Sequence, residues 1–239
     1  MELAEHTFGL PQISVLTPTY NRTKFLPLFI FNLKKQTYPH KKIEVVIDDD
    51  GSEPFCDNVE ELRKTLYPIK LIYHRNKKKR TIGEKRNNLV KLATSKILIN
   101  MDDDDIYNPA YIEYSHMTLK ENKCGIVGSN AMIFCYPEKE FKMTSIQCKH
   151  KYQIHEATMC YTKKYFKSMG GFRKNSQGEG VNMIQKQDTN VGLTDIALCM
   201  ICVAHDGNTI DKEQFNFEGE EQIYRGQEVP ILKQILSLK

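Results

Sequence analysis

Four consecutive aspartates, Asp102 to Asp105, carry the most evident chemistry in this chain, and they directly follow the apolar run at residues 97–99. Carboxylates crowded at the end of a buried strand repel one another and destabilise the fold unless a cation neutralises them. Magnesium and manganese prefer oxygen ligands and often share them with substrate phosphates. The cluster therefore predicts a site for Mg²⁺ or Mn²⁺; a solvated acidic loop is the plain alternative for a run of charges.

Two further polar stretches have the composition of a nucleotide site. "DDDGS" follows the apolar run at 43–47, and "HRNKKKR" follows the run at 69–73. Basic side chains fit phosphates or a nucleobase, so a nucleoside diphosphate held through a metal would use all of these groups. Each stretch also has a plain alternative. Asp and Gly favour ordinary turns, and Lys77 to Lys79 are typical of solvated surface, which leaves Arg80 as the base to single out.

The hydrophobic pattern predicts a scaffold that brings these clusters to one edge. Helical spacing of apolar residues alternates with short apolar runs that predict strands at 13–17, 43–47, 69–73, 96–100 and 125–134. Nearly all-apolar strands are typical of a mostly parallel α/β sheet with helices on both faces. Ligands of such sheets bind beyond the carboxyl ends of the strands. After residue 134 the alternation fades, and the pattern predicts a loop-rich C-terminal half within a single domain, 1–239.

Composition and charge narrow the class of protein. The chain has 239 residues, is 40% hydrophobic and carries a net charge of +4, which is too mild to indicate nucleic acid. The basic stretch also lacks the interleaved aromatics of a nucleic-acid surface. No apolar run approaches the roughly 18 residues of a membrane span, and the N-terminus has no signal-peptide pattern. Seven scattered cysteines predict reduced thiols in a soluble, cytoplasmic protein.

Two other kinds of site are disfavoured by the motifs. No G-x-G-x-x-G follows the first strand and no Walker A motif is present, which argues against dinucleotide and P-loop sites. Cys199, Cys202 and His205 have C-x-x-C-x-x-H spacing. A structural zinc needs four ligands, however, and the sequence shows no second close pair, so buried thiols are the preferred interpretation.

Five motifs occur in order and together resemble the family 2 glycosyltransferases of GT-A fold: "ISVLTPTYNR", "IEVVIDDDGS", "TIGEKRNN", "INMDDDDIYNP" and "GGFRKNSQGEGVN". The match covers residues 12–185. The resemblance implies a Rossmann-like sheet whose first half, 12–122, binds a nucleotide-sugar, and a second half, 123–239, that binds the acceptor and includes a C-terminal extension. It further implies metal-dependent transfer of a sugar, expected from a UDP-sugar and with inversion, to a hydroxyl of a glycan, lipid-linked or protein acceptor.

The resemblance also implies roles for individual residues. Asp104 and His205 would bind Mn²⁺ or Mg²⁺, with His205 in an H-x-x-N setting with Asn208. Asp50 would contact the base, expected to be uracil. The residues implied in nucleotide-sugar binding are Pro18, Thr19, Tyr20, Arg22, Asp49, Asp50, Arg80, Gly83, Arg86, Asp102 and Asp103.

The motif after Gly-Gly-Phe departs from the family pattern. The family's Glu-Asp pair reads Glu179-Gly180 here, and a usual later Asp is Asn182. We expect Glu179 to be the catalytic base that deprotonates the acceptor. Glu156, beside His155 and able to approach the acceptor, and Asp188 are the alternatives, as is a retaining mechanism that needs no such base.

Two other functions remain open at this point. One is a nucleotidyltransferase on a similar sheet, although its Gly-rich loop after the first strand is replaced here by "PTYNR". The other is a nucleotide-sugar-binding module without turnover, suggested by the missing Asp at position 180.

Overall fold

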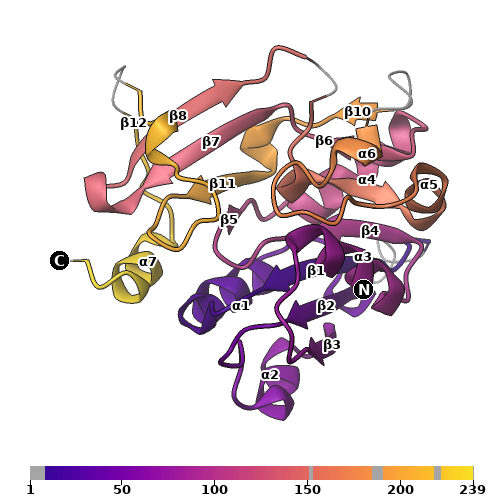
Figure 1. Cartoon of the computed structure of the whole chain (residues 1–239), viewed down its shortest axis with the longest axis horizontal. Helices are drawn as coiled ribbons and strands as arrows, with labels where there is room; N and C mark the ends of the chain where they lie inside the picture. The colour runs from indigo at the N-terminus through magenta and orange to yellow at the C-terminus, as the bar shows by residue number, and fades with distance from the viewer. Residues whose placement is uncertain (1–8, 151–152, 185–190, 218–221, 239) are drawn as a thin grey trace, which may run out of the picture.

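The computed structural model describes residues 9–150, 153–184, 191–217 and 222–238. Their strands form two sheets. In Figure 1 the smaller sheet lies at the upper left, and the larger sheet runs from the lower part of the molecule to the upper right. The strands of the larger sheet are β1 (Ile13–Thr19), β2 (Ile43–Asp49), β3 (Lys70–Arg75), β4 (Ile97–Asn100), β6 (Ile126–Gly128), β9 (Cys160–Thr162) and β10 (Val191–Leu193). Their order across the sheet is β10-β6-β9-β4-β1-β2-β3.

The larger sheet is mostly parallel, as the sequence predicts. Among the described residues, β9 alone runs antiparallel to its neighbours, β4 and β6. The register pairs Thr19 with Asp49 and Asp49 with Arg75, so β1, β2 and β3 end at the same level. This shared level places the loops after these strands side by side at one edge.

Helices cover both faces of the larger sheet, which confirms the α/β prediction. On β1, Val15 faces a core that includes Phe29 and Leu62, whereas the next residue, Leu16, faces a core that includes Leu89. Both residues are fully buried, as expected for a strand covered on each side. The helices are α1 (Leu26–Lys34), α2 (Val59–Leu66), α3 (Ile82–Leu92), α4 (Tyr111–Glu121), α5 (Lys163–Met169), α6 (Val181–Ile184) and α7 (Val229–Ile235).

The start of α3 is fixed by local sequence. Thr81 Oγ1 accepts a hydrogen bond from the Glu84 N–H at 3.2 Å, and Glu84 Oε2 accepts one from the Thr81 N–H at 3.0 Å. This capping box stabilises a helix start by about 1 kcal/mol. At Gly83, an added Cβ would lie 1.7 Å from the carbonyl oxygen of Arg173. The close approach of that loop therefore requires glycine at position 83.

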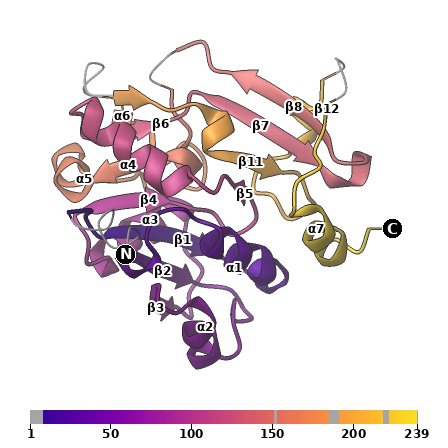
Figure 2. The ribbon, with the colours of Figure 1, turned by 180° about the vertical axis from the view of Figure 1, so that it is seen from behind.

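The second half of the chain is loop-rich, as predicted, but it also contributes most strands of a smaller sheet that the sequence pattern did not predict. Its strands are β5 (Ile106–Tyr107), β7 (Ala131–Tyr136), β8 (Lys142–Gln147), β11 (Met200–Val203) and β12 (Gln222–Ile223), in the order β12-β8-β7-β11-β5. Figure 2 shows this sheet from behind, with α7 beside α1. The C-terminal half thus contains more regular structure than its sequence pattern indicates.

The strand predicted at residues 125–134 is in fact two strands in different sheets, β6 and β7. Between them the Ser129 N–H donates to Thr158 Oγ1 at 2.9 Å, and Ser129 Oγ accepts from the Ala131 N–H at 3.1 Å. Side-chain partners therefore satisfy the backbone where the chain leaves one sheet for the other. Within the described ranges, no helix is long and apolar enough to cross a membrane.

Candidate functional site

A cavity of about 630 Å³ opens beyond the carboxyl ends of β1 and β4. The loop after β1, the start of α3 and the four aspartates after β4 form one side of it, and segments 155–157, 176–179 and 207–212 form the other. Its charged lining residues are Arg22, Lys79, Arg80, Lys85, Arg86, Lys212, Asp102, Asp103, Asp104, Asp105, Glu156 and Glu179.

Asp104 lies at the centre of a cluster of polar side chains. Its Oδ2 atom is 3.0 Å from His205 Nε2 and 3.0 Å from Arg22 Nη1. Burial alone would raise the pKa of the Asp104 carboxyl, but the hydrogen bond from His205 and the charge of Arg22 lower it. Asn208 fixes the histidine, because its Oδ1 accepts the His205 backbone N–H at 2.8 Å. The H-x-x-N spacing therefore serves to hold His205 against Asp104.

Asp103 has no comparable partners. It is 3% exposed, and its Oδ2 atom is buried without a hydrogen-bond partner among the described residues. Burial, and then the charge of Asp104, raise the pKa of the Asp103 carboxyl to about 8. Burial also raises the pKa of Asp105 well above its ordinary value. This part of the cavity therefore holds more carboxylate than its neighbouring cations neutralise.

Arg86 joins Asp102 to Glu179. Its Nη2 lies 3.2 Å from Asp102 Oδ1, and its Nε donates to Glu179 Oε1 at 3.0 Å. The guanidinium is 3% exposed, and its Nη1 has no hydrogen-bond partner in the part of the chain that the structure describes. A buried donor beside a cavity is expected to bind an oxygen of a ligand.

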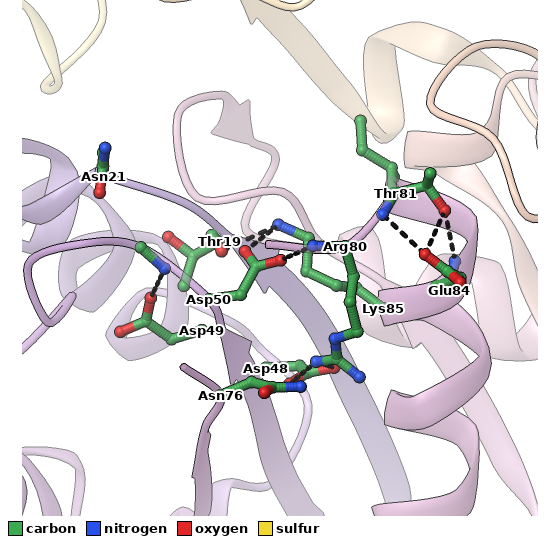
Figure 3. A network of polar contacts seen from close by, with 12 residues as sticks. Thr19, Asn21, Asp48, Asp49, Asp50, Asn76, Arg80, Thr81, Glu84 and Lys85 are labelled. Atoms are coloured by element: carbon green, nitrogen blue, oxygen red, sulfur yellow. Dashed lines mark hydrogen bonds and ion pairs between the residues drawn. The ribbon is translucent and has the colours of Figure 1, made fainter. Parts of the chain in front are cut away.

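The aspartates at the end of β2, Asp48 to Asp50, have many partners, in contrast to those after β4. Arg80 Nη2 donates to both oxygens of Asp48, at 2.6 and 2.7 Å. His74 Nδ1 lies 2.9 Å from Asp48 Oδ1, and Asn88 Nδ2 donates to Oδ2 at 3.1 Å. Figure 3 shows Arg80 reaching Asp48 through its side chain and Asp50 through its backbone.

Asp49 and Asp50 are equally well satisfied. Asp49 accepts from the backbone N–H groups of Gly51 and Phe55, from the Tyr73 hydroxyl, and from Arg75 Nη1 at 3.0 Å. Asp50 accepts from Lys85 Nζ at 2.9 Å and from the Arg80 N–H at 2.6 Å. These bonds hold Arg80 and Lys85, which both line the cavity.

The residues at Asp104 fit a divalent metal that also binds the substrate. Asp104 Oδ2 and His205 Nε2 converge, and the unpartnered Asp103 Oδ2 lies on the neighbouring residue. The described residues include no group of three or more His, Cys, Asp or Glu that could hold a metal by itself. Mg²⁺ and Mn²⁺ sites with only one or two protein ligands are completed by substrate phosphates and water.

The zinc interpretation of C-x-x-C-x-x-H has no such fit. Cys199 is buried and its Sγ donates to Thr194 Oγ1 at 3.3 Å, while His205 faces Asp104. A structural zinc needs four ligands, and the described residues provide no group of even three.

The structure brings most of the sequence-predicted site residues to one cavity. Those that line it are Pro18, Tyr20, Arg22, Arg80, Arg86, Asp102, Asp103, Asp104 and Glu179. His205 lies behind its wall, bonded to Asp104. Those that do not line it are Thr19, Asp49, Asp50 and Gly83, while Asp188 lies outside the described residues.

Sequence reasoning missed three cations of the cavity, Lys79, Lys85 and Lys212, of which Lys79 was assigned to solvated surface. Lys85 lies in the "GEKRNN" motif, so its place on α3 beside Arg86 was a usable signal. Burial would lower the pKa of Lys212, but Cys202 and Asp105 raise it, so this lysine stays charged. No motif surrounds Lys212, and only the folded chain brings it near Asp105.

Comparison with known proteins agrees with this geometry. The model of glycosyl transferase family 2 matches residues 14–179. Over 107 residues the chain is 30% identical to validoxylamine A glucosyltransferase of Streptomyces hygroscopicus, which covers 45% of this chain but only 25% of that relative's length.

Two solved structures share the fold. S. aureus TarS 1-349 in complex with UDP-GlcNAc has a TM-score of 0.65 at 18% identity, over 82% of this chain and 60% of that chain. The mannosyltransferase PcManGT of Pyrobaculum calidifontis, in complex with GDP-Man and Mn²⁺, has a TM-score of 0.66 at 17% identity, over 97% and 70%. The fold is thus of the GT-A type that the sequence predicts.

Proposed function

The chain belongs to glycosyl transferase family 2, and from this membership and the cavity we propose that it transfers a sugar from a nucleotide-sugar to an acceptor hydroxyl. The observation that carries the proposal is the set of aspartates after β4, which face the cavity with too few cations. A divalent metal ion supplies the missing positive charge, and the diphosphate that it binds uses the basic side chains of the cavity.

The donor in this proposal is a UDP-sugar. We place the base near Tyr20, Lys85 and Arg80, which line the cavity together, while Asp50 lies outside the lining and holds Lys85 and Arg80 through its carboxylate. The diphosphate points toward Arg22 and Asp104. TarS, which shares the fold, was solved with UDP-GlcNAc, whereas PcManGT was solved with GDP-Man, so the nucleobase is the part of the donor that a screen must decide.

Asp104 and His205 are the residues that would hold Mn²⁺ or Mg²⁺. When bound there, the ion supplies Lewis-acid stabilisation of the diphosphate leaving group. Arg22 already places a positive charge on Asp104 Oδ2, so this guanidinium must share or give up that oxygen when the site is filled. Residues 123–239 contribute the opposite wall of the cavity, through Glu156, Glu179 and Lys212, and we assign the acceptor to that side.

A thermal-shift screen of UDP-, GDP- and other nucleotide-sugars, each with Mn²⁺ and with a chelator, tests the donor. A ligand at 100 times its dissociation constant stabilises the native state by about 2.7 kcal/mol. We expect the largest shift with a UDP-sugar and Mn²⁺. No shift with any nucleotide-sugar would contradict the proposal.

Release of free nucleoside diphosphate then separates the proposed function from its alternatives. A glycosyltransferase releases it faster when an acceptor is supplied. A nucleotide-sugar-binding module releases none, and a nucleotidyltransferase instead releases pyrophosphate from a nucleoside triphosphate.

A further inference from the structure

Position 180 has no side chain, and another residue fills the space where one would lie. A Cβ built on Gly180 would be 2.6 Å from Glu156 Cγ, 2.8 Å from Met159 Cε and 2.9 Å from Glu156 Oε1. The φ angle of Gly180 is not among the positive ones, so its backbone conformation tolerates a side chain. Steric overlap, and not the backbone conformation, therefore excludes a side chain at position 180, and the Glu156 carboxyl occupies that space.

Glu156 is anchored so that its carboxyl faces the cavity. It begins the short helix Glu156–Thr158, between β8 and β9, and its carbonyl oxygen accepts a hydrogen bond from Asn100 Nδ2 at 2.6 Å. Its Oε1 accepts the Gly180 N–H at 3.0 Å. The side chain is partly exposed and lines the cavity, so an acceptor hydroxyl can reach it.

The second carboxylate on this wall, Glu179, has a different environment. Its Oε1 accepts from Arg86 Nε, and the residue is 5% exposed. The guanidinium occupies the oxygen that it contacts, which leaves less of this carboxylate open to an attacking hydroxyl. No lysine or arginine is in salt-bridge contact with Glu156 among the described residues. Burial, and then the charge of Glu179, raise the pKa of the Glu156 carboxyl, which moves it toward the range in which general bases work best.

We propose that Glu156 is the general base of the transfer and that its carboxylate occupies the space that a side chain at position 180 would take. The inference rests on the inverting transfer that belongs to the proposed function. The acceptor hydroxyl gives its proton to the Glu156 carboxylate as its oxygen forms a bond to the anomeric carbon. The bond from that carbon to the diphosphate oxygen breaks, and its electron pair leaves with the nucleoside diphosphate. Glu179 keeps Arg86 in place and is a positioning residue.

The first test compares Glu156→Gln with Glu179→Gln, using donor affinity from calorimetry and kcat for transfer. The amide oxygen of a glutamine at 156 can still accept the Gly180 N–H, so the fold and the donor site are retained. We expect Glu156→Gln to lower kcat by about 10²–10⁴-fold with donor affinity within two- to threefold of wild type. Glu179→Gln should lower kcat by less than about tenfold and mainly weaken donor binding through Arg86.

The second test moves the carboxylate. Glu156→Ala removes two of the three atoms nearest to a Cβ at position 180, and the third, Met159 Cε, is the end of an unbranched side chain that can shift, which makes room for the aspartate of Glu156→Ala/Gly180→Asp. We expect kcat of this double variant to be at least tenfold higher than kcat of Glu156→Ala. Its matched control, Glu156→Ala/Gly180→Asn, has the same shape without the charge and should recover nothing.

A Glu156→Gln variant within a few-fold of wild type, or equal recovery by the aspartate and asparagine double variants, would overturn the inference and leave the proposed function intact. The anomeric configuration of the product, read by NMR, tests the premise separately. Retention of configuration would overturn the inverting mechanism and the base assignment with it, whatever the variants do.

Discussion

Two runs of aspartate end neighbouring parts of the same sheet, and they differ in how their charge is balanced. Asp48, Asp49 and Asp50 are buried and have cationic partners throughout, from Arg80, Arg75 and Lys85. The run from Asp102 to Asp105 is also largely buried, but its cations, among them Arg22 and Arg86, are fewer than its carboxyl groups need.

This difference indicates that Asp48 to Asp50 have a structural role and that Asp102 to Asp105 form the ligand site. A buried carboxylate with its full set of donors stabilises one geometry and has no need of a ligand. In the run at the end of β2, Asp48 and Asp50 hold Arg80 and Lys85 at the cavity through their hydrogen bonds. In the run after β4, burial raises the pKa of Asp102, Asp103 and Asp105, which is the mark of charge that the folded chain does not compensate.

The largest expected effect comes from breaking the compensated run. Asp48→Asn removes the charge that faces Arg80 and His74, and leaves a mostly buried guanidinium without its counter-ion. Loss of one partner of a buried ion pair typically costs about 3–5 kcal/mol, and because Arg80 is partly exposed we expect about 3 kcal/mol. Urea unfolding measures this, with the exposed Asp57→Asn as control. A loss below about 1 kcal/mol would show that this run is not scaffold.

The second effect is on the pH dependence of stability, and it comes from His155, which lines the cavity near the run after β4 and which burial keeps uncharged. Burial, and then the charge of Lys212, lower the pKa of His155 to about 4. Between pH 6.5 and 4 the unfolded chain therefore binds a proton at this histidine that the folded chain does not, so wild type loses stability as the pH falls through this window.

The variant His155→Gln removes that titration. Relative to the variant, wild type should lose about 2 kcal/mol of unfolding free energy between pH 7 and pH 4.5. Urea titrations at the two pH values give the comparison. A difference in unfolding free energy that does not change with pH would mean that His155 has the same pKa in the folded and unfolded chains, and that burial does not lower it.

The smallest expected effect has the opposite sign to that of Asp48→Asn. In metal-free protein, Asp103→Asn relieves repulsion within the run from Asp102 to Asp105, so the free energy of unfolding should rise by about 1 kcal/mol. Thermal unfolding in the presence of a chelator measures the change. If Asp103→Asn lowered the free energy of unfolding by as much as Asp48→Asn does, the two runs would not differ in how their charge is balanced.

The sequence predicts the place of both runs but not their partners. Buried parallel strands have nearly continuous apolar runs. The ends of β2 and β4, and the polar clusters there, can therefore be recognised from the sequence alone. The partners of Asp48 could not be predicted, because the register that sets Asp48 opposite His74 is a property of the paired strands. The division of residues 125–134 between two sheets likewise depends on Thr158, which is distant in sequence.

Glu156 illustrates the same limit at the site. The motif analysis shows that position 180 lacks an acid, and it finds Glu179 in the matching stretch. Only the folded chain shows that the carboxyl of Glu156, which comes from a different segment, fills the space beside Gly180. Contacts between distant segments carry no periodic pattern, so a single sequence cannot reveal them.

Calorimetric titration of UDP into the protein, with Mn²⁺ and with a chelator, tests the central claim that the run after β4 is completed by a divalent cation. We expect Mn²⁺ to tighten UDP binding by about 10–100-fold in wild type, and Asp104→Asn to abolish that gain while retaining the metal-independent affinity. Asp57→Asn, on the surface, should behave as wild type. Equal UDP affinity with Mn²⁺ and with the chelator in wild type would contradict the account.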